Sequence, residues 1–240
     1  YMKRPKIKLL IPNLVTLTGL SFGLSSIRFA FFEEFNIAVI CVLIAGVCDV
    51  LDGLFSRILK AESDMGAELD SLSDFLSFGV APGIILYFGL IDQEQMWGYI
   101  AITAYIIFSC IRLAIFNINL STNALAEHRG YFMGIPTPAG AGLILSPLIH
   151  SFLGYDWGIN NPLILNIYVV TIGVLLVLKI PTFSFKQIKG SINKKIYIRF
   201  FFAFVLLLML MINFLWQFLS VFGMIYLLSI PISIYSYNKN

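Results

Sequence analysis

The stretch CDVLDGLFSRILKAESDMGAELDSLSDFLSFGV, residues 48–80, places four aspartates inside or beside apolar runs: Asp49, Asp52, Asp70 and Asp74. A carboxylate at the centre of a membrane-spanning helix costs roughly 2.5–3.5 kcal/mol even on lenient insertion scales, so such residues are rare and usually functional. The sequence on both sides of this stretch is apolar enough to lie in lipid. The four carboxylates therefore mark the candidate site of a membrane protein.

The composition of the whole chain agrees with a membrane protein. Of its 240 residues, 59% are hydrophobic and 12% are charged, whereas a soluble domain carries about 25% charged residues. No Pro/Gly/Ser-rich or acidic linker divides the chain, so we expect a single domain over residues 1–240. A membrane-spanning helix needs about 20 mostly apolar residues. Eight segments fit, near residues 12–32, 36–58, 68–91, 97–119, 135–154, 162–179, 197–213 and 217–236.

The distribution of basic residues supports this count. Fourteen of the sixteen Lys and Arg residues fall in alternate connections or at the termini, and the exceptions are Arg28 and Arg112. Cytoplasmic connections of membrane proteins carry an excess of Lys and Arg. The first apolar run continues to about Phe32 without a small-x-small cleavage site, so we expect a retained helix and no cleaved signal peptide. The sequence predicts an all-α, polytopic bundle of about eight transmembrane helices with both termini in the cytoplasm.

The spacing of the aspartates predicts that they meet. Asp49 and Asp52 are three residues apart and Asp70 and Asp74 are four apart, so each pair shares a face of its helix. The segment RILKAESDMGAE, residues 57–68, is a short cytoplasmic link, so the two helices run side by side in opposite directions. We expect the four carboxylates to gather near the cytoplasmic end of the bundle.

Four carboxylates this close need a counter-charge to stay ionised. Magnesium binds through carboxylates together with substrate phosphates, and manganese prefers the same oxygen ligands. The sequence has no cluster of Cys or His that would favour a softer metal. It therefore predicts a site for one or two divalent ions, Mg or Mn. Helix capping and pairing with cytoplasmic lysines are the structural alternatives, and a cation channel or transporter is the non-enzymatic one.

The same stretch resembles the signature of the CDP-alcohol phosphotransferase family. That signature is Asp, two residues, Asp-Gly, two residues, Ala-Arg, eight residues, Gly, three residues, Asp, three residues and Asp. Every spacing is matched here, by Asp49, Asp52, Gly53, Ser56, Arg57, Gly66, Asp70 and Asp74. The one departure is Ser56, where the family usually has alanine, and serine is small enough to keep the packing.

The resemblance implies transfer of a phosphatidyl-type group from a CDP-linked lipid to an alcohol, with release of CMP. It implies six membrane helices, often in a homodimer, over residues 10–180, and leaves two additional C-terminal helices at about 195–237. Asp49, Asp52 and Asp70, joined by Asp74, would hold the metal, and Asp74 would also be the general base. The implied CDP-lipid-binding set is Asn13, Thr16, Gly53, Ser56, Arg57 and Gly66.

Further stretches resemble the phosphatidylserine synthase branch of the family. They are IPNLVTLTGL (11–20), LDSLSDFLSFGVAPGIILY (69–87), RLAIFNI (112–118) and FMGIPTPAGAG (132–142). With the signature, they extend the resemblance over most of residues 10–145. The branch implies CDP-diacylglycerol and L-serine as substrates and an active site on the cytoplasmic face of the bacterial inner membrane.

Arg112 is the candidate acceptor-binding residue. It is a cation in an otherwise apolar helix, and intramembrane arginines are functional candidates whose planar fork suits a carboxylate such as that of serine. Three alternatives stay open. Arg112 could pair structurally with an aspartate, it could join Arg129 in binding glycerol 3-phosphate, or the acceptor could be inositol or choline, the latter calling for an aromatic cage.

Overall fold

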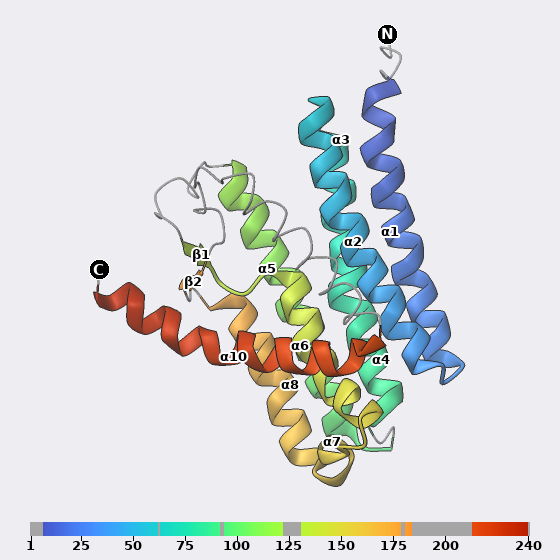
Figure 1. Ribbon diagram of the computed structural model, residues 1–240, viewed down its shortest axis with the longest axis vertical. Coiled ribbons are helices and arrows are strands. Elements are labelled where there is room, and N and C mark those ends of the chain that lie inside the picture. The colour runs from blue at the N-terminus through green and yellow to red at the C-terminus, as the bar shows by residue number, and fades with distance from the viewer. Residues whose placement is uncertain are drawn as a thin grey trace, which may run out of the picture.

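The computed structural model describes residues 7–61, 63–91, 94–121, 131–178, 181–183 and 213–239, and most of them are helical (Figure 1). Five helical segments of this part of the chain are long and apolar enough to cross a membrane. They are α1 (Ile7–Phe31), α2 (Phe35–Leu59), the continuous α3–η1–α4 (Asp64–Asp74, Phe75–Val80 and Ala81–Leu90), α5 (Met96–Ser121) and α10 (Leu215–Lys239).

Two shorter helices correspond to the fifth and sixth predicted spans. They are α6 (Thr137–Phe152) and α8 (Pro162–Val177), joined through the single turn α7 (Trp157–Asn160). At 1.5 Å per residue each of the two is about 24 Å long, which is shorter than a hydrocarbon core of about 30 Å. The predicted helix at 217–236 is confirmed by α10, whereas nearly all of the predicted span 197–213 lies outside the described residues.

A short strand pair departs from the all-α prediction. Strand β1 (Tyr131–Met133) pairs antiparallel with β2 (Pro181–Phe183), and Phe132 lies opposite Thr182. Strands of three residues are too short to give a readable alternation of apolar and polar residues. The pair joins the segment before α6 to the segment after α8.

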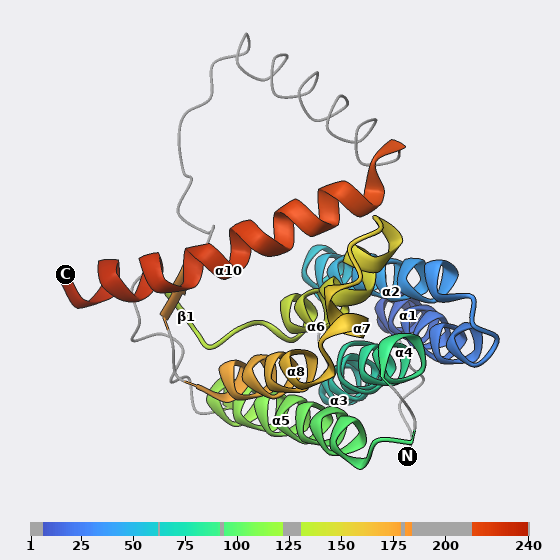
Figure 2. The same ribbon diagram turned by 90° about the horizontal axis from the view of Figure 1, so that it is seen from below.

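Helices α1, α2 and α3 form the part of the bundle that carries the aspartates, with α1 packed along α2 (Figures 1 and 2). Small residues allow the two helices to approach closely, as in many membrane bundles. A Cβ added at Gly19 of α1 would lie 3.0 Å from the Cβ of Cys48 on α2. This contact holds the polar residues of α1 against the stretch of α2 that contains Asp49 and Asp52.

A π-helical segment, η1, follows Asp74 directly and lies at the centre of the bundle. It contacts α1, α2, α5 and α6. The wider turn shifts the backbone hydrogen bonds, and the carbonyl of Phe78 accepts a bond of 2.9 Å from the hydroxyl of the fully buried Tyr105 on α5. Such π segments are frequent at functional sites. This one sets the direction in which the helix continues beyond Asp74.

Helix α10 is oriented differently from the bundle. Its axis runs across the bundle instead of alongside the other helices, as both ribbon views show (Figures 1 and 2). It packs on α6 and on strand β2. Near its start, the rings of Trp216 and Phe152 meet edge to face, with centroids 4.8 Å apart.

Candidate active site

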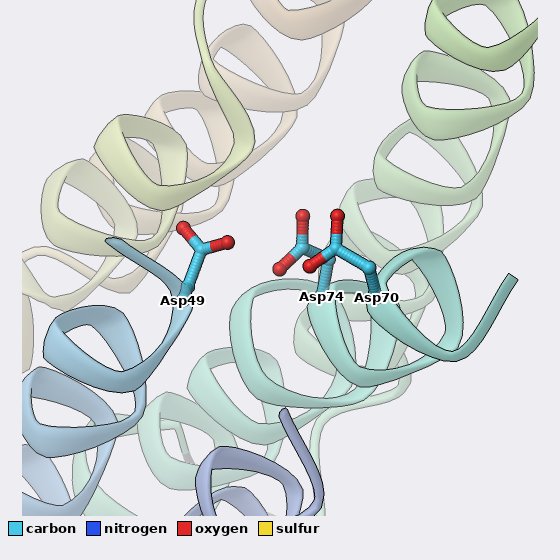
Figure 3. A group of neighbouring side chains, drawn as sticks. All are labelled: Asp49, Asp70 and Asp74. Carbon is cyan, nitrogen blue, oxygen red and sulfur yellow. The ribbon is translucent and has the colours of Figure 1, made fainter. Parts of the chain in front are cut away.

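Three carboxylates from two helices converge on one point. Asp49 projects from α2 toward Asp70 and Asp74 on α3, and one oxygen of each lies within 4.8 Å of the others (Figure 3). Asp49 and Asp74 are each ten residues from the helix ends that flank the α2–α3 link, which places them about 15 Å along the two helices. Oxygen ligands at this separation could hold a hard divalent cation.

A pocket of about 190 Å³ adjoins the carboxylates between α1, the end of α2 and the start of α3. We call it the α1–α3 pocket. Five of the six residues that the sequence assigned to CDP-lipid binding line it: Asn13, Thr16, Gly53, Ser56 and Gly66. Asp52 and Asp70 line it as well, so Asp70 belongs to both the carboxylate cluster and the pocket.

Asp52 is held apart from the other three carboxylates. Its Oδ2 accepts a hydrogen bond of 2.5 Å from the hydroxyl of Thr16, and the side chain is buried. Asp52 remains close enough to interact electrostatically with Asp49, Asp70 and Asp74. The structure therefore groups three of the four predicted metal ligands and directs the fourth toward the pocket.

Arg57, the sixth residue assigned to CDP-lipid binding, lies outside the pocket lining. Its Nε donates a hydrogen bond of 2.8 Å to the carbonyl of Gly53, one turn earlier on α2, and its side chain is exposed. This bond keeps the guanidinium beside Gly53, which does line the pocket. Arg57 is thus positioned at the edge of the site.

Arg112 lies on α5 at nearly the height of the carboxylates. Two contacts define the height of α5 against the antiparallel α3 and η1. The Ser109 side chain lies against Gly79, and Asn117 donates a hydrogen bond to Ser71. Between these two contacts Arg112 lies level with Leu76, which is two residues, or about 3 Å along the axis, beyond Asp74. The guanidinium is buried, donates from Nε to the carbonyl of Ile135 at 3.1 Å, and lies over the ring of Phe116. Arg129, its possible partner, lies outside the described residues.

Two features of the site were missed at the level of sequence. Ser63 lines the α1–α3 pocket and caps α3 by accepting a hydrogen bond of 3.1 Å from the backbone N–H of Gly66. A serine followed at once by an acidic residue, here Asp64, is a readable signal for the start of a helix. The second feature is the pair of Asn117 and Ser71, joined at 3.0 Å beside Asp70. No local pattern reveals this pair, because its members are 46 residues apart.

A family model matches the sequence over most of the chain. The model describes CDP-alcohol phosphatidyltransferases and covers residues 9–180, which include the carboxylates, the α1–α3 pocket and Arg112. The chain belongs to the CDP-alcohol phosphatidyltransferase family. The predicted family is thereby confirmed, and α10 lies outside the part of the chain that the model matches.

Relatives within the CDP-alcohol phosphatidyltransferase family extend the comparison. The chain is 36% identical to the CDP-diacylglycerol–serine O-phosphatidyltransferase of Mycobacterium leprae (strain TN) over 174 residues, 72% of this chain but only 57% of the relative. It is 36% identical to the enzyme of the same name from Helicobacter pylori (strain ATCC 700392 / 26695) over 197 residues, 82% of this chain and 81% of the relative. The Bacillus subtilis (strain 168) enzyme of that name is 32% identical over 74% of this chain and 92% of its own length.

Membership in the CDP-alcohol phosphatidyltransferase family and the apolar helices together make the chain an integral membrane protein. The carboxylate cluster suits the divalent metal that this family generally uses. The site thus combines a cluster that could bind metal, a pocket beside it, and a buried arginine on a neighbouring helix.

Proposed function

We propose that the chain transfers the phosphatidyl group of CDP-diacylglycerol to the hydroxyl of L-serine, forming phosphatidylserine and CMP. The observation that carries the proposal is the junction at Asp70, where the carboxylate cluster meets the α1–α3 pocket. A cluster that could bind metal beside such a pocket suits a diphosphate whose nucleotide occupies the pocket. The shared name of the three relatives supports serine as the acceptor.

In this reaction the serine oxygen attacks the lipid-side phosphorus, and the bond from that phosphorus to the bridging oxygen breaks to release CMP. Asp49, Asp52, Asp70 and Asp74 would hold one or two Mg or Mn ions, which neutralise the diphosphate and the charge on the leaving CMP. Asp74 takes the proton of the serine hydroxyl as general base. Asn13, Thr16, Gly53, Ser56, Arg57 and Gly66 bind the nucleotide end of the donor.

The proposal also places the protein in its membrane. The basic residues of the alternate connections support about eight spans with both termini and the active site on the cytoplasmic side. The bacterial sources of the three relatives support the bacterial inner membrane. The match over residues 9–180 supports a six-helix core within one domain, to which the C-terminal helices are added. A homodimer is expected from the family resemblance.

An acceptor panel tests the proposed reaction. Purified protein with CDP-diacylglycerol and a divalent ion is given serine, glycerol 3-phosphate, inositol or choline, and the lipid product and CMP are measured. We expect phosphatidylserine with serine and little product with the others. Turnover with a different acceptor would keep the chemistry and overturn the choice of serine. Ion flux without CMP release would place the protein among channels or transporters.

The crowding at Gly66 gives a prediction for the α1–α3 pocket. A Cβ there would lie 3.0 Å from the Ser63 hydroxyl and 3.1 Å from Oδ1 of Asn13. Overpacking of this kind typically costs about 1–3 kcal/mol, so we expect Gly66→Ala to weaken CDP-diacylglycerol binding roughly 5- to 150-fold. At Gly53 the added Cβ meets only Nη2 of Arg57, at 3.6 Å, so Gly53→Ala should cost less. Equal affinities for both variants in a lipid-binding titration would contradict this geometry.

A second prediction concerns Arg112 and the acceptor. If its guanidinium binds the serine carboxylate, Arg112→Ala should remove a charged hydrogen bond worth about 1.5–3 kcal/mol. We therefore expect the KM for serine to rise roughly 10- to 150-fold, with the affinity for CDP-diacylglycerol little changed. Steady-state kinetics with each substrate varied in turn measure both quantities.

Arg28 supplies the matched control, because its guanidinium also lies over a ring, that of Phe32 at 5.6 Å, but at the far end of α1. Arg28→Ala should leave both affinities near those of the wild type. Arg112 also donates a hydrogen bond to the Ile135 carbonyl. Arg112→Lys, which keeps the positive charge, is therefore measured as well. Parallel loss of lipid binding and serine response in both Arg112 variants would make Arg112 a structural residue.

A further inference from the structure

A second cavity, of about 210 Å³, lies between α2, α6 and α10. We call it the α10 cavity. Its walls include Val42 and Gly46 of α2, Phe78 of η1, Leu145 of α6, and Phe222 of α10. Apart from Tyr226, each of its described lining residues is apolar or glycine. This lining suits a hydrocarbon ligand and offers almost nothing to a polar one.

The α10 cavity begins one helical turn from the carboxylate cluster. Gly46 is three residues before Asp49 on α2, and Phe78 is four residues after Asp74 on the helix that continues from α3. From Gly46 the cavity follows α2 back to Val39, seven residues away, or about 10 Å along the axis. It therefore extends the reaction site on the side away from the α2–α3 link.

Tyr226, the one polar side chain among the described lining residues, is related to the acceptor residue. Tyr226 of α10 is close enough to Arg112 for the two groups to interact electrostatically. The Tyr226 hydroxyl is buried and has no hydrogen-bond partner within the described part of the chain. The described lining thus carries one polar group, on the side of Arg112, and is otherwise apolar, as an acyl chain requires.

We infer that the α10 cavity holds one acyl chain of the lipid donor and that α10, by closing it, sets the length of chain that the enzyme accepts. This inference rests on the proposed function, which places a diacylglycerol phosphate at the carboxylates. A chain leaving that centre along η1 and α2 enters the cavity within one turn. Each buried methylene favours binding, and α10 adds a wall that residues 9–180 do not supply.

Two glycines make the inference testable without crowding the protein. Gly142 on α6 and Gly223 on α10 line the cavity from opposite walls, and a Cβ added at either meets nothing within 4 Å. The first carbon of a side chain at either position therefore meets no neighbour, and we expect a leucine there to extend into the cavity. Replacing a helical glycine also favours the helix, so the variants should fold.

The experiment measures serine-dependent CMP release with dioleoyl and dioctanoyl CDP-diacylglycerol for the wild type, Gly142→Leu and Gly223→Leu. We expect the ratio of kcat/KM for the long chain to that for the short chain to fall roughly tenfold in each variant, as when about two methylenes leave an apolar site. Ala114→Leu is the control, because Ala114 is exposed on α5 and should leave the ratio unchanged. An unchanged ratio in both glycine variants would overturn the inference.

A second measurement separates this inference from the proposed reaction. CDP-diacylglycerol with a photoreactive diazirine near the chain end is crosslinked to the wild-type protein without serine, and the labelled peptides are identified. In the wild type we expect labels on α10 near Leu219 and Phe222. The same labelling of Gly223→Leu should lack them. Labels confined to other helices would overturn the acyl-chain assignment while leaving the reaction standing. Failure of the wild type to release CMP with either donor would overturn the reaction, and the α10 labels would still report the lipid chain.

Discussion

Asp70→Asn is expected to abolish serine-dependent CMP release and to remove metal-dependent binding of CDP-diacylglycerol. Asp70 contributes an oxygen to the three-carboxylate cluster and also lines the α1–α3 pocket. Asparagine keeps the size of the side chain but removes the negative charge that a hard divalent cation requires. Asp49→Asn removes charge from the opposite helix and should have the same effect, because the cluster is built from both α2 and α3.

The matched control is Glu68→Gln, which makes the same chemical change two residues earlier on α3. The Glu68 side chain is exposed and stands outside the cluster, so its activity should stay near that of the wild type. Isothermal titration with Mn or Mg reports metal binding separately from turnover. Full activity or undiminished metal binding in Asp70→Asn and Asp49→Asn would refute the metal assignment.

The local parts of this site could be predicted because helical spacing determines them. Residues four apart, such as Asp70 and Asp74, share a face in any helix, and a short link keeps the end of α2 near the start of α3, although α3 itself packs mainly on α1. The pocket residues Asn13 and Thr16 were predicted from the family resemblance and not from spacing, and both line the α1–α3 pocket.

What could not be predicted depends on contacts between distant segments. Asp52 shares a helical face with Asp49, but the hydroxyl of Thr16, 36 residues away, directs it into the pocket. The bond from Arg112 to the Ile135 carbonyl joins a helix to an irregular segment, which has no periodic signal. The length of its apolar run predicted that α10 is a helix. That length carries no information on how the helix axis is oriented, and α10 crosses the bundle. The π-helical segment after Asp74 likewise has no recognisable sequence signature.

The position of Asp74 separates its role from that of its neighbours. Asp52 and Asp70 line the α1–α3 pocket, whereas Asp74 is not among the residues of that lining. Asp74 instead ends α3, where the π segment carries the helix on toward Phe78 and the α10 cavity. It is also about level with Arg112, the proposed acceptor residue. A base that takes the proton of the acceptor hydroxyl is expected on this side of the cluster, away from the nucleotide.

Asp74→Asn should therefore lower kcat by about 10²–10⁴-fold, the usual contribution of a general base, while binding of CDP-diacylglycerol falls much less. Asparagine fills the same space at the end of α3 but cannot accept the proton of the serine hydroxyl. Asp74→Glu restores a carboxylate, displaced by one methylene, and should recover part of the rate, which a purely steric role would not predict. Single-turnover kinetics at saturating CDP-diacylglycerol separate the chemical step from binding. A variant that binds the donor poorly but turns over normally once saturated would make Asp74 a metal ligand alone, and the base would have to be sought among the other carboxylates of the cluster.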